Sequence, residues 1–410
     1  MSRPVSEQIG YLLESLPRSE GAFVTQEIAA LQRHGFVIVP LVLRRRRPDA
    51  GPSGAGYWQH AIQAPAAFSL RCALSQVGAL LRSPGGYLLA LRLVVQRIAR
   101  SPRQAPEMLA SLWQAGYIAT QMSRRIRHIH AHLAGTVATV AWLLATMTGR
   151  SYSFAIHAEE LFAKAPTALG IKIAEAEFVV ARSEYTRQRV LKRHRLVAEG
   201  KLHLIYRGVD PGDFEPVDHL RKGPPVIMSV GRLVEKKGFP YLLQSASILQ
   251  SRGVDFRLVI VGDGPMHQYL VRMAGGLQLR DRVEFVGGAS RAELRRLYEQ
   301  ADVFALPSVV AADGDRDGLA VVLLEVLAMG IPTVASKISA IPELIEHQKT
   351  GLLAQSGDPR DLADKLEVAL YDEEVRGRLS LLGRRKIEKY FDANRNATAL
   401  ATLLTQVLRG

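Results

Sequence analysis

The stretch PVIMSVGRLVEKKGFPYLLQSASILQ, residues 225–250, decides the fold of this 410-residue chain. It begins with a short apolar run, Val226 to Val230, which is typical of a strand buried on both faces. A polar loop with Gly231 and Gly238 follows, and a helical pattern then runs from Tyr241 to Gln250. A strand, a glycine-containing loop and a helix in this order predict one repeat of a parallel α/β sheet.

The same alternation of strands and helices extends outward in both directions. At the start of the chain, apolar runs at Ile9 to Leu13 and Val37 to Val42 bracket a helical stretch, Phe23 to Gln32. Beyond the opening stretch, strands are predicted at 257–261, 283–286, 303–306 and 333–335, with helices at 266–275, 291–300 and 319–329. We therefore predict an α/β protein with two Rossmann-like domains whose parallel sheets face across a cleft.

The boundary between the two domains is predicted from glycine and proline content. Residues 208–225 are the best linker, because glycines and prolines are concentrated there. We expect an N-terminal Rossmann-like domain over 1–215 and a C-terminal one over 222–385. A helical segment over 386–410 is expected to pack back toward the N-terminal domain.

The positive charge of the chain is concentrated in one segment. The chain has a net charge of +14, and residues 31–150 contain fifteen arginines, no lysine and only Asp49 and Glu107 as acids. The densest run is Arg44 to Arg47, and a basic amphipathic helix is predicted further on, with Arg92 and Arg100 on its polar face. An anionic membrane surface is the expected partner, although a solvated helix face would show the same pattern. Nucleic acid is not expected, because no known binding signature is present.

Cysteine content and hydropathy indicate the compartment. A single cysteine, Cys72, makes no intrachain disulfide, which favours a reducing cytoplasm. The apolar stretch from Leu133 to Met147 is shorter than the roughly 20 residues of a spanning helix. We expect a cytoplasmic protein, peripheral on the inner face of the cell membrane.

Two loops after predicted strands have the composition of a phosphate-binding site. Arg232 and Lys237 lie in the loop that begins at Gly231, where two cations would clamp a diphosphate and neutralise it as a leaving group. The next strand ends in a Gly-Asp-Gly turn, whose glycines would let backbone approach a ligand closely. The residues of that turn are Gly262, Asp263 and Gly264.

The most specific pattern is a pair of acids, Asp317 and Glu325, with seven residues between them. It predicts a helix N-terminus just after Asp317, with backbone amides at Gly318, Leu319 and Ala320 that attract a phosphate. Eight residues of helix place the two acids roughly 12 Å apart along the axis. Glu325 lies among leucines and valines, where an acid without a partner is costly to bury.

A calcium loop and a zinc site are both disfavoured. Asp313, Asp315 and Asp317 match the start of an EF-hand loop, but its twelfth position is Leu324 instead of glutamate. Three alternating histidines share one predicted strand face without a fourth ligand at metal spacing, and these are His128, His130 and His132. No metal is therefore expected.

His157 follows another predicted strand, Tyr152 to Ile156. At the carboxyl end of a strand it would face the cleft and donate a hydrogen bond to a sugar hydroxyl or take part in proton transfer. A structural role for a single histidine is the alternative.

Together these residues resemble glycosyltransferase family 4, the retaining enzymes of the GT-B fold. The resemblance spans about residues 5–400 and is strongest over 226–355. Its start is similar to members that build bacterial exopolysaccharides such as colanic acid. The motifs that carry it are Gly231-Arg232 with Lys237-Gly238, the turn 262–265, the acids Asp317 and Glu325, and His157 followed by Glu160.

The resemblance implies a role for each of these residues. Arg232 and Lys237 would bind the donor diphosphate, Glu325 the ribose, Asp317 the hydroxyls of the transferred sugar and His157 the sugar near the reaction centre. The family usually has glutamate where this chain has Asp317, so the donor preference is expected to differ.

The implied activity is transfer of a sugar from a nucleotide-sugar to a glycan or lipid-linked acceptor in polysaccharide biosynthesis, with no cofactor. Other enzymes of the same fold, such as a phosphorylase or a sugar-nucleotide epimerase, and a non-catalytic nucleotide-sugar-binding protein are the alternatives. A basic scaffold protein that docks on acidic lipid is a third.

Overall fold

A computed structural model describes residues 8–16, 23–44, 58, 60–162, 166–216 and 223–409. The chain forms two compact units, which we call unit 1 (Met1–Ile205 with Asn394–Gly410) and unit 2 (Tyr206–Ala393). The domain limits predicted from the sequence, at 215, 222 and 386, stay predictions. Arg45, Arg46 and Arg47 of the predicted basic run lie outside the described residues.

Unit 1 is built on a seven-stranded sheet in the order β3-β2-β1-β4-β5-β6-β7, and every neighbouring pair is parallel. Its strands are β1 Gln8–Ser15, β2 Val37–Arg44, β3 Ile62–Gln63, β4 Ile126–Ala131, β5 Ser151–Ile156, β6 Val179–Ala181 and β7 Leu202–Leu204. Its α-helices are α1 Phe23–Arg33, α2 Leu70–Arg82, α3 Pro84–Arg100, α4 Ala105–Gln121, α5 Thr136–Thr148, α6 Leu169–Glu175, α7 Glu184–Ala198 and α15 Ala393–Arg409.

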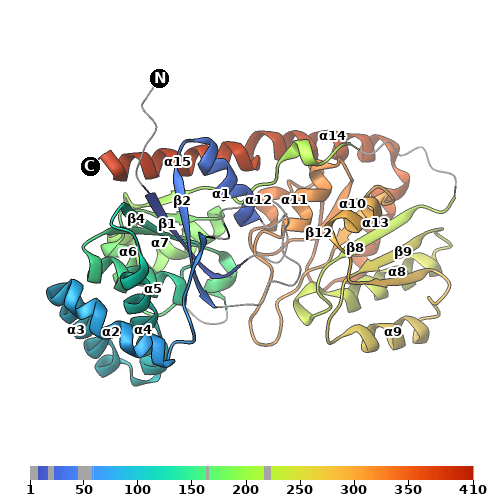
Figure 1. The fold of residues 1–410 in the computed structure, drawn as a ribbon. Coiled ribbons are helices and arrows are strands. Elements are labelled where there is room, and N and C mark those ends of the chain that lie inside the picture. The colour runs from blue at the N-terminus through green and yellow to red at the C-terminus, as the bar shows by residue number, and fades with distance from the viewer. Residues whose placement is uncertain are drawn as a thin grey trace. The chain divides into compact units, whose positions relative to one another are not determined.

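Both faces of this sheet are buried, as a parallel sheet requires. Successive side chains of β1 alternate between two apolar clusters: Tyr11 and Leu13 pack with α1 and α15, whereas Leu12 packs with α3, α4 and α5. Figure 1 shows α1 and α15 along one side of these strands and α2, α3 and α4 gathered on the other. The period of two in a nearly continuous apolar run therefore gives a sheet between two helical layers.

Unit 2 repeats the same plan with six strands in the order β10-β9-β8-β11-β12-β13, again all parallel. The strands are β8 Val226–Val230, β9 Arg257–Val261, β10 Val283–Gly287, β11 Val303–Leu306, β12 Thr333–Ser336 and β13 Leu352–Ala354. The α-helices are α8 Phe239–Ser251, α9 His267–Gly276, α10 Arg291–Tyr298, α11 Val321–Ala328, α12 Ile341–Leu344, α13 Pro359–Tyr371 and α14 Glu373–Tyr390. The strands and helices predicted for this unit are confirmed to within two residues at each end.

Strand order tells where ligands bind in such sheets. In each unit the order reverses beside the first strand, between β1 and β4 in unit 1 and between β8 and β11 in unit 2. At such a reversal the two flanking loops leave toward opposite faces and open a crevice at the carboxyl edge. The loops after β8 and β11 contain the predicted diphosphate site.

No helix in the described ranges combines the length and apolar character needed to cross a bilayer. The apolar helix α5 is instead buried in the core of unit 1, since its side chains form one cluster with those of α4 and β4. This position explains why its sequence is hydrophobic on all sides.

The helix α15 completes the core of unit 1. Leu400 and Leu404 are fully buried against β1 and α1, in the same cluster as Ile9 and Ile28. The last helix of the chain is therefore part of the first unit's core.

We expect Leu400→Ala to lower the free energy of unfolding of the chain by about 2–5 kcal/mol, because it removes buried apolar contacts and leaves a cavity. Leu196→Ala is the matched control, since Leu196 is 97% exposed. Denaturant unfolding of both variants checks this, and equal stability of the two would contradict the buried position of α15.

Candidate functional site

The loop that follows β8 and the loop that follows β11 are joined by a backbone hydrogen bond at the carboxyl edge of unit 2. The Val309 amide donates to the Lys236 carbonyl at 2.9 Å. Gly238 has a φ of +68°, and a Cβ at this position would lie 1.8 Å from the Pro307 carbonyl oxygen. Only glycine fits there, so the Lys-Gly pair of the motif is explained by close packing of two loops.

Gly262 and Gly264 pack against the same loop, the one that follows β8. A Cβ on Gly262 would lie 2.1 Å from the Gly231 carbonyl oxygen, and one on Gly264 would lie 2.4 Å from the Leu233 carbonyl oxygen. Between them, the carbonyl of the exposed Asp263 accepts a 2.9 Å hydrogen bond from the Leu233 amide. In the described structure these glycines pack closely against the protein's own backbone, and their predicted approach to a ligand stays a prediction.

Lys237 and Asp317 form an ion pair at this edge. Lys237 Nζ lies 2.8 Å from Asp317 Oδ2, and the two side chains are only 14% and 9% exposed. The Ser308 hydroxyl donates to the same carboxylate oxygen at 2.5 Å. The pair therefore holds one cation and one carboxylate at fixed positions beside the reversal in strand order.

Arg232 differs from Lys237 in its surroundings. Its side chain is exposed, and within the described ranges it makes no hydrogen bond or ion pair. An exposed guanidinium on a loop whose backbone is fixed can reach an anionic ligand without breaking an existing contact.

The helix after Asp317 begins later than predicted. Gly318 and Leu319 form a bend, Ala320 is the N-cap without a side-chain cap, and α11 starts at Val321. The helical spacing of roughly 12 Å between Asp317 and Glu325 is therefore wrong, because the first four residues are not helical. No side chain caps α11, and the backbone amides of its first turn still point out of its N-terminal end.

Glu325 lies on α11 and has the partner that its apolar surroundings require. The Tyr298 hydroxyl donates to Glu325 Oε2 at 2.9 Å. Burial raises the pKa of Glu325 above its usual value, and the hydrogen bond from Tyr298 opposes that rise. Tyr298 belongs to α10, so the sequence spacing of the two acids contained no signal for this contact.

Two acids of the calcium-like run, Asp315 and Asp317, form ion pairs with lysines. Lys236 Nζ lies 2.9 Å from Asp315 Oδ2, next to the Lys237–Asp317 pair. Within the described residues, no group of three or more histidine, cysteine or acidic side chains is arranged to hold a metal ion.

In unit 1, Glu160 joins the loops that follow β4 and β5. Its carboxylate accepts hydrogen bonds from the amides of Ala134 at 3.1 Å, Gly135 at 2.8 Å and His157 at 3.1 Å. Burial raises the pKa of Glu160, whereas the three amide donors and the buried Lys172 act to lower it. These contacts indicate that Glu160 positions the two loops.

His157 and His132 lie side by side at the carboxyl edge of unit 1. Their ring centroids are 5.3 Å apart, and Phe23 lies 4.9 Å from His132 and 6.0 Å from His157. His157 is also the N-cap of the short 3-10 helix Ala158–Leu161. His132 follows β4 at the reversal in strand order, so both histidines occupy the position where parallel sheets place ligands.

A buried charge network beneath these histidines was missed by the sequence analysis. Glu27 Oε2 and Arg182 lie 2.7 Å apart, and both side chains are almost fully buried. Tyr11 donates its hydroxyl to Glu27 and lies 3.0 Å from His132 Nδ1. Burial by itself would raise the pKa of Glu27, but Arg182, His132 and the hydrogen bonds from Tyr11 and Arg182 lower it.

No spacing rule links these residues, because Tyr11, Glu27, His132 and Arg182 come from four separate elements. The one available signal was an acid, Glu27, on an otherwise apolar helix face.

The two histidines of β4, His128 and His130, are structural. Both reach the Ser153 hydroxyl, His128 with Nε2 at 2.7 Å and His130 with Nδ1 at 2.8 Å. Burial lowers the pKa of each to about 3, so both imidazoles are neutral.

Two pockets are lined by described residues of unit 1. One, of about 690 Å³, lies at the carboxyl ends of β1 and β2 and is lined in part by Glu14, Arg44, Glu107 and Gln114. Glu107 and Gln114 belong to α4, so this helix forms one wall. Its carboxylates and amide suit a ligand with several hydroxyl groups.

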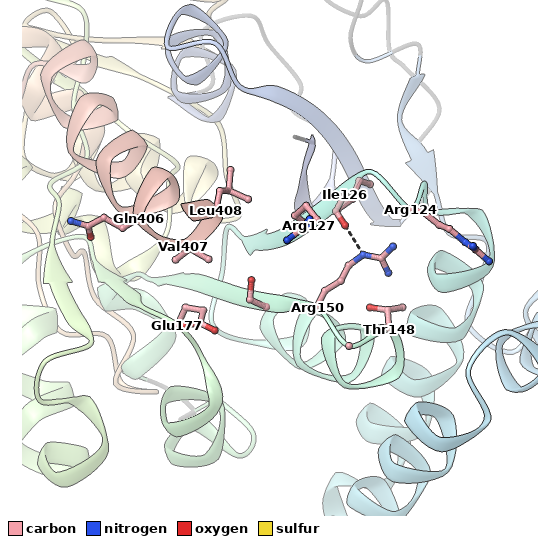
Figure 2. A pocket seen from close by; sticks show the side chains of 11 residues that line it. Arg124, Ile126, Arg127, Thr148, Arg150, Glu177, Gln406, Val407 and Leu408 are labelled. Atoms are coloured by element: carbon pink, nitrogen blue, oxygen red, sulfur yellow. Dashed lines mark hydrogen bonds between the residues drawn. The ribbon is translucent and has the colours of Figure 1, made fainter. Parts of the chain in front are cut away.

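The other pocket, of about 770 Å³, lies at the opposite, amino edge of the sheet (Figure 2). Arg124, Arg127 and Arg150 line it, and Arg150 Nε donates to the Ile126 carbonyl at 2.5 Å. It is separate from the residues predicted to bind substrate.

Comparison with known proteins defines the class. Residues 213–386 match the family model "Glycosyl transferases group 1", and this range contains every predicted site residue of unit 2. This segment matches the family, and the resemblance to glycosyltransferase family 4 is confirmed.

Individual relatives are bacterial glycosyltransferases. The chain is 36% identical over 223 residues to the amylovoran biosynthesis glycosyltransferase AmsK of Erwinia amylovora, covering 53% of this chain and 54% of that protein. It is 37% identical over 206 residues to the putative colanic acid biosynthesis glycosyltransferase WcaL of Escherichia coli, covering 50% and 51%. The chain thus spans about half the length of the curated relatives it matches.

Solved structures confirm the GT-B fold. Sucrose-phosphate synthase from Thermosynechococcus elongatus has a TM-score of 0.70 at 20% identity, covering 98% of this chain and 99% of that chain. The lipopolysaccharide outer core galactosyltransferase WaaB has a TM-score of 0.66 at 16% identity, covering 97% and 99%. At such identities the likeness concerns the fold alone.

Glu27→Gln is expected to destabilise the chain by about 3–5 kcal/mol near neutral pH, because it leaves the Arg182 charge buried without its carboxylate. The pKa of Glu27 is lowered by folding, so its contribution is present above 4.5 and is lost as the pH falls further. The difference between wild type and variant in urea unfolding should therefore shrink at acidic pH.

Glu14→Gln is the control for this prediction. Glu14 pairs with Arg44 at 3.3 Å, but both side chains are solvent-exposed. Its loss should change stability by less than about 1 kcal/mol. Equal effects of the two substitutions would contradict the assigned network.

Proposed function

We propose that the chain is a retaining glycosyltransferase that moves a sugar from a nucleotide-sugar to a hydroxyl of a glycan or lipid-linked acceptor in polysaccharide biosynthesis. The observation that carries the proposal is the Lys237–Asp317 pair, with Arg232 on the same loop, at the strand-order reversal of unit 2. This edge lies within the segment that matches the family model.

In the proposed reaction the donor diphosphate binds Arg232 and Lys237. These cations, with the uncapped first turn of α11, stabilise the negative charge that develops as the bond between the anomeric carbon and the diphosphate breaks. The acceptor oxygen bonds to the same face of that carbon, and its proton passes to the departing diphosphate. The two cations supply the positive charge that a metal would otherwise bring.

The remaining residues are proposed to orient the substrates. Asp317 would accept hydrogen bonds from the hydroxyls of the transferred sugar, because Lys237 and Ser308 hold its carboxylate in place. Glu325 would bind the ribose, and His157 the sugar near the reaction centre. Glu160 would act indirectly, since its carboxylate orients the loop of His157.

The acceptor is proposed to bind unit 1. The pocket at the carboxyl ends of β1 and β2 offers Glu14, Glu107 and Gln114, which suit a polyhydroxylated ligand. Two relatives are named as glycosyltransferases of amylovoran and colanic acid biosynthesis, which supports a role in exopolysaccharide synthesis. We place the protein at the cytoplasmic face of the membrane, where the basic segment of unit 1 would meet anionic lipid.

Arg232→Ala should lower kcat by about 100- to 1000-fold, because it removes one of the two charges on the leaving diphosphate. The side chain is exposed, so the melting temperature should stay unchanged. Steady-state transfer assays with a nucleotide-sugar and an acceptor extract measure the effect.

Arg257→Ala is the matched control. Arg257 is exposed and pairs with Glu284 at 3.1 Å, at the amino end of β9. If both variants keep full activity, the assignment of Arg232 to the donor site is wrong.

A thermal-shift screen against a panel of nucleotide-sugars tests donor binding independently of the acceptor. A ligand present at 100 times its dissociation constant should stabilise the chain by about 2.7 kcal/mol. Asp317→Asn should weaken this stabilisation, since it removes the partner of Lys237. If no nucleotide-sugar or nucleoside diphosphate shifts the transition, the donor site proposed for unit 2 is wrong.

A further inference from the structure

The helix α2 carries its large apolar side chains on the solvent side. Leu70, Leu74, Val77 and Leu81 recur at helical spacing and are 74%, 64%, 59% and 76% exposed. They form a single continuous stripe, because residues spaced by three and four lie on one face of a helix. A helix that packed in the ordinary way would bury this stripe.

The inner side of α2 is made of small residues. Cys72 and Ala79 are buried, and a Cβ on Gly78 would lie 3.2 Å from Thr120 Cγ2 of α4. The Gln76 amide donates to the Trp113 carbonyl of α4 at 3.0 Å. The small inner face lets the two helices pack closely, so the outward stripe is not a failure of packing.

The next helix, α3, continues the pattern. It buries Ala90 and Val94 fully, whereas Leu88, Leu89 and Val95 are 56%, 50% and 57% exposed. Of the twenty large hydrophobic side chains exposed in the described residues, eight lie between Phe68 and Val95. We call these eight side chains the apolar face; they are Phe68, Leu70, Leu74, Val77, Leu81, Leu88, Leu89 and Val95.

The charge around the apolar face has one sign. No aspartate or glutamate occurs between Asp49 and Glu107. Arg71, Arg92 and Arg100 are exposed on α2 and α3, and no ion pair joins them to a carboxylate within the described residues. Exposed leucines on two helices that contain arginines and no acid match the two properties of an anionic bilayer surface, an apolar interior and negative headgroups.

We infer that the apolar face docks unit 1 on an anionic lipid bilayer. Helices of 13 and 17 residues are too short to span a bilayer and are suited to lie in its interface. A second copy of the chain fits this face less well, because it would bring two sets of arginines together without an acid between them.

The position of the face agrees with the acceptor proposed above. The helix α4 packs against α2 on one side and lines the pocket at the carboxyl ends of β1 and β2 with Glu107 and Gln114. A bilayer under α2 and α3 would therefore place a lipid-linked acceptor close to that pocket. The inference rests on the proposed function for this link, while its physical evidence lies wholly within unit 1.

Vesicle co-sedimentation of the full chain tests the inference. Phosphatidylcholine vesicles that contain phosphatidylglycerol should bind the wild type, and vesicles of phosphatidylcholine alone should bind it far more weakly. The Leu74→Ser/Leu81→Ser variant should lose at least about tenfold in affinity for the anionic vesicles. The Leu196→Ser/Leu381→Ser variant, with the same change at two exposed leucines elsewhere, should bind like the wild type.

A charge variant and a mass measurement complete the test. Arg71→Gln/Arg92→Gln/Arg100→Gln should bind anionic vesicles more weakly and respond less to added salt. The inference is overturned if the leucine variant binds vesicles like the wild type, or if light scattering shows a dimer that this variant dissociates. Nucleotide-sugar thermal shifts in the same variants should match the wild type, so loss of vesicle binding is distinguishable from failure of the donor site.

Discussion

Parallel pairing of the strands is the constraint on which the rest of this structure depends. Successive parallel strands are joined by crossovers, so the loops that follow the strands of one sheet all begin at the same edge. In unit 2 this brings the loops after β8 and β11 together, and the pairing of Val303 with Ile227 sets their register. The Lys237–Asp317 pair joins residues 80 positions apart because of that edge.

The loops at these edges are held by backbone contacts more than by side chains. Gly238 permits the carbonyl of Pro307 to approach, and Gly262 permits that of Gly231. In unit 1 the loops are held instead by the Glu160 carboxylate, which accepts hydrogen bonds from three backbone amides. Both solutions fix loops whose exposed side chains then remain available to ligands, which is what preorganised charge stabilisation requires.

The strands and helices were largely predictable, because apolar runs and helical periodicity are local properties. The start of α11 was not, since nothing in the Asp317 to Ala320 sequence shows that a bend precedes the helix. The packing of Gly262 and Gly264 against the loop after β8 was not predictable either, because a glycine pattern shows that something approaches the backbone without showing what. Long-range partners such as Tyr298 for Glu325 and Arg182 for Glu27 lay beyond any spacing rule.

The sequence by itself determined the fold class, the resemblance to a glycosyltransferase family and the elements that carry Arg232, Lys237, Asp317, Glu325 and His157, because these depend on patterns within short segments. Only the tertiary structure decided which residues meet: the Lys237–Asp317 pair, the Glu27 network under His132, and the outward direction of the leucines on α2. The physical reason is that amphipathic periodicity shows that a helix has an apolar face, whereas packing against α4 decides whether that face is buried or left to a partner.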